Sequence, residues 1–192
     1  NILFIVEGLA RLIGHDNNSI KTIAKLGNGN WIGLGSLLRL KACEEVNASE
    51  EIKAISIPEE IIINLYKNEK TFQEFCDSFL FPCEVLSITE DLIQKSSRTD
   101  INLITAFNIL NKTAKLNLPH QGEKYKQDKE EISILASANI NNKTMFEIID
   151  ENSTIKSDNL FKARVIKFPK ILYNEFKKLP TENTAIQNSK NN

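Results

Sequence analysis

The chain has 192 residues, of which 41% are hydrophobic and 26% charged, and its formal net charge is −1. This composition is typical of a soluble globular protein, and the near-zero charge excludes a global field that draws it to nucleic acid or anionic lipid. No apolar stretch approaches the roughly 20 residues that a membrane helix needs, and no signal-peptide pattern is visible. We therefore expect a cytoplasmic location, which includes the cytosolic face of a membrane transporter. Because the first residue is Asn, we also expect a processed chain or a piece of something longer.

Glycine concentrates at the front, where six of the seven glycines fall within the first 35 residues. Tight turns between short apolar runs indicate β structure. Ile2–Val6 and Leu9–Ile13 are predicted to form a hairpin around Gly8. Ile20–Leu26 is predicted to be the next strand, and Gly27–Asn30 the turn that closes it. Short strands with such regular turns favour a barrel or roll over a parallel sheet.

Helical patterns begin after this region. Ser36–Leu40 is predicted to form one or two helical turns, and Ile52–Ile57 a returning strand. Pro58 suits the first turn of a helix, which is expected to stop near Asn68. The spacing of apolar residues predicts further helices over residues 71–117.

Within that helical region, Ser87 or Thr89 is predicted to cap a helix. A later helix is expected to carry an apolar stripe of Ile101, Ile104, Phe107, Ile109 and Leu110.

The polar segment Pro119–Glu131 is the main predicted boundary. Beyond it, "ISILASANI", "TMFEII" and "KARVIKFP" are predicted to be short strands. We therefore expect a roll with a trailing helix over residues 1–80 and a helical segment over 81–120. A small β-containing unit over 121–180 and a flexible tail or linker over 181–192 follow.

The chemistry-bearing residues are few. The three cysteines, an odd number without metal-type spacing, argue against a disulfide framework or a zinc site and favour a reducing compartment. The two histidines exclude a multi-histidine metal cluster. Neither a G-x-S-x-G elbow nor a P-loop occurs. Adjacent acids such as Glu44 and Glu45 are interpreted as a solvated loop. We expect no catalytic residue, no metal and no cofactor.

The order of elements in "LFIVEGLARLIG", "IAKLGNGNWIGLGSLL" and "IKAISIPEEIIINLYKNEKTFQEF" resembles the cyclic-nucleotide-binding domain family over about residues 2–80. Gly8 matches the hairpin glycine of that family and Gly29 its turn glycine. Gly33 and the segment 36–38 match its phosphate cassette. The resemblance implies an α+β fold: a cyclic-nucleotide-binding-like β-roll (a double-stranded β-helix or jelly roll), then helices and a smaller β-containing C-terminal unit. It also implies a degenerate ligand-binding cassette made of Gly33, Leu34, Gly35, Ser36, Leu37, Ala42 and Cys43.

Two departures from the family pattern weaken the cassette. Leu34 stands where the family has the glutamate that receives the ribose 2′-hydroxyl. The arginine that pairs with the cyclic phosphate falls near Ala42 or Cys43, while Arg39 and Lys41 are out of register. Losing a charge-assisted pair costs roughly 1.5–3 kcal/mol and leaving a hydroxyl unpaired about 1–3 kcal/mol. We therefore predict that the chain does not bind cAMP or cGMP.

The roll of the family also has a helix and about two strands before the first predicted hairpin. We therefore expect the roll either to be cut short or to be completed by another segment, which is the second unit or a neighbouring molecule.

The residue pattern of "WIGLGSLL…CEEVNASEEIKAISIPEE" resembles the cytosolic regulatory region at the N-terminus of cyanobacterial peptide- or toxin-secretion ABC transporters. That resemblance implies a non-catalytic sensing or docking module. Its expected partners are other domains of a transporter or secretion protein, or a second copy through helices 72–117. Nucleic acid is not an expected partner, and a membrane is one only indirectly.

Three alternatives stay open at this stage. A transcription regulator of the cAMP-receptor type predicts a helix-turn-helix after the roll. A jelly-roll enzyme predicts a bound metal. A structural assembly protein predicts that the stripe over residues 101–110 is an interface.

Overall fold

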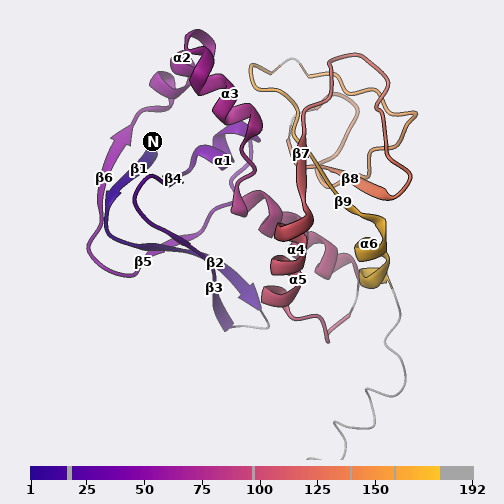
Figure 1. The fold of residues 1–192 in the computed structure, drawn as a ribbon, viewed down its shortest axis with the longest axis horizontal. Helices are drawn as coiled ribbons and strands as arrows, with labels where there is room; N and C mark the ends of the chain where they lie inside the picture. The colour runs from indigo at the N-terminus through magenta and orange to yellow at the C-terminus, as the bar shows by residue number, and fades with distance from the viewer. Residues whose placement is uncertain (17–18, 97, 139, 158, 178–192) are drawn as a thin grey trace, which may run out of the picture.

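The computed structural model describes residues 1–177 except 17–18, 97, 139 and 158. The described chain has a mixed helix and strand fold with three small antiparallel sheets (Figure 1). None of its described helices has both the length and the apolar character needed to cross a bilayer. The tail predicted over residues 181–192 lies outside the described residues.

The N-terminal part of the chain forms the first two sheets, with strand orders β4-β1-β6 and β3-β2-β5. Their strands are β1 (Ile2–Glu7), β2 (Ala10–Asp16), β3 (Ser19–Leu26), β4 (Trp31–Ile32), β5 (Val46–Ala48) and β6 (Lys53–Ile57). Every pairing within them is antiparallel. The prediction that these strands do not form a parallel sheet is therefore confirmed, whereas closure into a barrel or jelly roll stays a prediction.

The hairpin predicted around Gly8 is wrong. β1 pairs with β4 and β6, whereas β2 pairs with β3 and β5, so the two strands lie in different sheets. Gly8 has a φ of +92°, and a Cβ there would lie 2.2 Å from the carbonyl oxygen of Glu51. The glycine therefore forms a corner at which the chain passes from one sheet to the other. The hairpin is instead β2–β3, in which Asp16 is paired with Ser19.

Six helices accompany these sheets in the described chain: α1 (Leu34–Leu38), α2 (Glu59–Asn68), α3 (Lys70–Ser78), α4 (Pro82–Ser96), α5 (Leu103–Thr113) and α6 (Lys170–Lys177). α2 starts after Pro58 and ends at Asn68, as predicted. The capping role predicted for Ser87 or Thr89 is wrong, because both lie inside α4. The Thr89 hydroxyl donates back to the Val85 carbonyl at 2.7 Å.

The helix predicted around residues 101–110 is α5, which Asn102 caps by accepting a hydrogen bond from the Thr105 N–H at 3.0 Å. Phe107 and Leu110 of the predicted stripe are buried, whereas Ile109 is 44% exposed. Ile109 therefore does not belong to the buried face.

The third sheet has the order β7-β9-β8, with β7 at Lys115–Asn117, β8 at Glu131–Leu135 and β9 at Val165–Pro169. The predicted strand "TMFEII" is wrong, since this segment forms turns and a single bridge from Ile148 to Ile134. α6 follows directly on β9, where the sequence pattern predicted no helix.

One hydrophobic cluster runs through the front sheets, the helices and part of the third sheet, and includes Ile5, Leu34, Leu86, Ile134 and Phe168. A smaller cluster, which includes Tyr125, Leu135 and Ile149, lies within the C-terminal part. The division of the chain at residues 80, 120 and 180 stays a prediction.

Candidate functional site

The predicted cassette is a sharp bend that leads into α1. Gly33 precedes the helix with a φ of +89°, a left-handed conformation that favours glycine. A Cβ added to Gly35 would lie 2.7 Å from the Cys83 sulfur and 3.1 Å from the Phe81 side chain. The two glycines therefore set the bend and let α1 pack closely against the start of α4.

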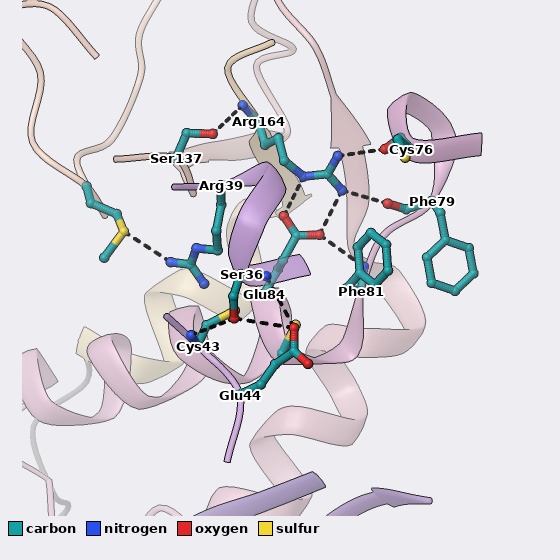
Figure 2. A network of polar contacts seen from close by, with 12 residues as sticks. Ser36, Arg39, Cys43, Glu44, Cys76, Phe79, Phe81, Glu84, Ser137 and Arg164 are labelled. Carbon is teal, nitrogen blue, oxygen red and sulfur yellow. Dashed lines mark hydrogen bonds and ion pairs between the residues drawn. The ribbon is translucent and has the colours of Figure 1, made fainter. Parts of the chain in front are cut away.

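A carboxylate of the chain itself fills the anion position of this bend (Figure 2). One oxygen of Glu44 accepts the Gly33 N–H at 2.6 Å. The other accepts the Ser36 N–H at 3.2 Å and the Ser36 hydroxyl at 3.3 Å. N–H groups at the start of a helix lack intrahelical partners and attract anions. Glu44 therefore supplies an acceptor from within the chain for the backbone N–H groups at the start of α1.

The interpretation of Glu44 as a solvated loop acid is thus wrong. Glu44 is half-buried in the cassette, whereas the adjacent Glu45 is exposed and contacts His15 on the surface. The two side chains diverge as expected, but one of them turns inward because the unpaired N–H groups attract it.

The other predicted cassette residues lie in different surroundings. Leu34 is fully buried in the main hydrophobic cluster, and Leu37 packs against that cluster. Ala42 is exposed and lines an open cavity that Arg39 also lines. The structure therefore gathers only Gly33, Gly35, Ser36 and Cys43 around the bend.

Two thiols complete the site. The Cys43 N–H donates to the Ser36 hydroxyl at 3.1 Å, and the Cys43 sulfur lies 3.5 Å from that hydroxyl oxygen. Cys83, in the first turn of α4, donates its S–H to Glu44 at 3.5 Å. The two sulfurs and a Glu44 oxygen all lie within 4.8 Å of one another.

The pKa values of the two thiols are shifted in opposite directions. The pKa of Cys43 is lowered, first by a hydrogen bond from Cys83 and also by the Arg39 guanidinium and Ser36, although burial opposes the shift. The pKa of Cys83 is raised, first by its hydrogen bond to Cys43 and then by burial. Ionisation is therefore favoured at Cys43 over Cys83.

Arg39, the residue directly after α1, is a fully buried cation. Its Nη2 donates to the Met145 sulfur at 3.1 Å, and its guanidinium carbon lies 5.6 Å from the centre of the Phe146 ring. Its Nε and Nη1 have no hydrogen-bond partner among the described residues. The side chain borders an open cavity of about 270 Å³, which Ala42 also lines.

Sequence reasoning missed Glu44 and Cys83 as members of the site. Glu44 lies eight residues after Ser36, a spacing that matches no motif. Cys83 comes from a separate helix, so only the fold brings it to the bend. A signal was nevertheless present: N–H groups at a bend that leads into a helix need an acceptor, and Glu44 is the first acidic residue after Gly33.

No family model matches the chain, and no curated protein matches it. Several solved structures do. The chain matches cAMP-bound PfPKA-R (141–441) at 17% identity and a TM-score of 0.31, covering 99% of this chain and 70% of the other. It matches the regulatory domain of Toxoplasma gondii PKA with cAMP at 10% identity and a TM-score of 0.33, covering 98% and 77%.

A third match is the cAMP-bound form of the EAL enzyme Bd1971, at 14% identity and a TM-score of 0.34. It covers 75% of this chain and 34% of that enzyme, so the chain spans about a third of the enzyme's length. At these TM-scores the likeness by itself assigns neither a ligand nor a function to this chain.

Proposed function

We propose that the chain is a non-catalytic regulatory module with a cyclic-nucleotide-type cassette that Glu44 closes from within. The observation that carries this proposal is the Glu44 carboxylate on the N–H groups of Gly33 and Ser36. In this function the module responds to contacts with a partner domain, and cAMP and cGMP are not its ligands.

The closure has a simple electrostatic basis. A cyclic phosphate needs the N–H groups that Glu44 already occupies, so the two anions compete for one position. Two like charges about 4 Å apart repel by about 4 kcal/mol at an effective dielectric constant of about 20. The side chains that hold the ligand in the family are also not in place, because Leu34 is in the core and the guanidinium of Arg39 is directed to Met145 and Phe146.

The more specific assignment is to the cytosolic regulatory region of a toxin- or peptide-secretion ABC transporter, with its cytoplasmic location and transporter partners. Only the residue pattern of the sequence supports this assignment. Dimerisation through helices 72–117 is likewise a proposal from the sequence pattern. Sequencing of the gene on both sides of this segment tests the first, and sedimentation of the purified chain tests the second.

A transcription regulator of the cAMP-receptor type is the second candidate. It requires a helix-turn-helix after the roll, whereas the described chain continues from α5 into β7, β8 and β9. A gel shift with random-sequence DNA distinguishes the two candidates, since the proposed module leaves the DNA unshifted.

The closure is tested by chemical rescue of Glu44→Ala. This variant empties the anion position, so we expect a lower melting temperature that millimolar acetate or inorganic phosphate partly restores at constant ionic strength. The matched control is Glu45→Ala, which removes the neighbouring exposed carboxylate and gains nothing from added anions. The wild-type protein is expected to show no saturable heat with millimolar cAMP. Saturable stabilisation of the wild type by cAMP or cGMP contradicts the proposal.

A further inference from the structure

Cys43 and Cys83 lie on two different elements, the loop after α1 and the start of α4, and meet beneath the bend. We propose that these two residues form a peroxide-sensitive dithiol, in which Cys43 is oxidised first and Cys83 then closes a disulfide with it. This modification site is independent of whether the cassette binds nucleotides.

The geometry allows the reaction. The two sulfurs lie within 4.8 Å of each other, and a disulfide requires them to approach to about 2.05 Å. Cys43 stands in an irregular loop, where its N–H is held by the Ser36 hydroxyl rather than by a helix or sheet. A shift of the loop by about 2–3 Å therefore brings the sulfurs into bonding distance without unfolding α4.

The two sulfurs differ in the way that such a pair requires. Cys43 is partly exposed, whereas Cys83 is 4% exposed. The thiolate is the reactive form, and neighbouring cations favour it. The nearby guanidinium of Arg39 is fully buried with two unpartnered nitrogens, and a buried cation needs a counter-charge. A hydrogen bond from Cys83 and the charge of the Arg39 guanidinium lower the pKa of Cys43, which favours its thiolate.

The chemistry balances with hydrogen peroxide as the oxidant. The Cys43 thiolate attacks one peroxide oxygen; an S–O bond forms, the O–O bond breaks and hydroxide leaves. The Cys83 thiol then attacks the resulting sulfenic sulfur; the S–S bond forms, the S–O bond breaks and water leaves with the Cys83 proton. The peroxide gains two electrons and the protein loses two hydrogens.

The surroundings favour this reaction over a metal site, although the same two sulfurs and Glu44 could share an ion. Two donors from Ser36 and one from Gly33 already use the Glu44 oxygens. The Arg39 cation next to Cys43 also repels a second cation, whereas it stabilises a thiolate.

The test is peroxide treatment of the folded chain, followed by alkylation of the remaining thiols and mass spectrometry. Before alkylation we expect an intact mass lower by about 2 Da, and after alkylation a single cross-link between the peptides of Cys43 and Cys83. Cys76 is an internal control, because it is fully buried and burial raises its pKa to about 12. It is expected to remain reduced.

Four further variants, one of them a control, assign the roles. Cys83→Ser is expected to leave a sulfenic acid on Cys43 that dimedone traps, and Cys43→Ser to leave Cys83 reduced. Arg39→Met is expected to slow alkylation of Cys43 roughly threefold to tenfold, since one pKa unit changes the thiolate fraction about tenfold. Lys41→Met removes a neighbouring exposed cation and is expected to leave that rate unchanged.

Several results overturn the proposal: oxidation of Cys76 at the same rate as Cys43, over-oxidation of wild-type Cys43 without a disulfide, or tight stoichiometric binding of Zn²⁺ that blocks both thiols. Melting curves of each variant show whether it is folded, so a failure to fold is not mistaken for a loss of reactivity. None of these outcomes depends on nucleotide binding, so this proposal and the closed cassette stand or fall separately.

Discussion

Arg164 donates hydrogen bonds to both carboxylate oxygens of Glu84 in the protein interior. Its Nε lies 2.5 Å from one oxygen and its Nη2 lies 2.8 Å from the other. The two side chains are 2% and 0% exposed. The same guanidinium donates to the carbonyls of Cys76 and Phe79 at 2.8 and 2.6 Å (Figure 2). One side chain from just before β9 therefore joins the end of α3 to the start of α4 across 80 residues of sequence.

Arg164→Ala is expected to lower the free energy of unfolding by about 3–5 kcal/mol, because it leaves the Glu84 carboxylate buried without its partner. The double variant Glu84→Ala, Arg164→Ala removes both charges and is expected to cost less than the two single variants added together. Urea unfolding measures all three. As a control, Lys53→Ala breaks the exposed pair with Glu7 and is expected to cost less than about 1 kcal/mol. An additive double variant contradicts this account.

Gly35→Ala is expected to lower the free energy of unfolding by about 1–3 kcal/mol, although alanine is the better helix former. The added methyl would lie 2.7 Å from the Cys83 sulfur. Removing that sulfur in a Gly35→Ala, Cys83→Ala double variant is expected to recover part of the loss. Gly27→Ala is the control, since its nearest neighbour would be 3.8 Å away. Equal melting temperatures for Gly35→Ala and Gly27→Ala would show that α1 does not press on α4.

His15 is expected to titrate above its ordinary pKa of 6.5, because it shares a hydrogen bond with Glu45 at 2.7 Å and feels that carboxylate's charge. A histidine with a raised pKa binds its proton more tightly in the folded state. The stabilisation by this pair is therefore complete below pH 6.5 and is lost as the pH rises through the folded-state value. NMR titration of the His15 ring measures the midpoint, which Glu45→Gln is expected to lower. Glu90→Gln removes a more weakly acting carboxylate and is expected to move the midpoint less.

Local signals in the sequence predicted local structure well. The run before Pro58 became β6 and the segment after it became α2, because proline and the apolar spacing act within a few residues. A bend is also present at Gly8, which has a left-handed φ of +92°. The hairpin inferred from that glycine was wrong, since a turn residue shows where the chain bends and not which strand it pairs with afterwards.

In the candidate site, too, the features within one short segment could be predicted and those set by the fold could not. Gly33 and Ser36 could be found from the sequence because they lie in one short segment that resembles a known cassette. Arg39 was noted only as out of register, and its burial next to Cys43 is a property of the fold. Cys83 could not be found, because it reaches the bend only when α4 packs on α1.

The main hydrophobic cluster spans the chain from Ile2 to Phe176 and has a consequence for dissecting the molecule. A fragment that stops at residue 120 loses Ile134, Ile166 and Phe168 from that cluster, and so strips the helices of apolar neighbours. Such a fragment is expected to aggregate rather than fold alone, while the full chain melts in a single cooperative transition.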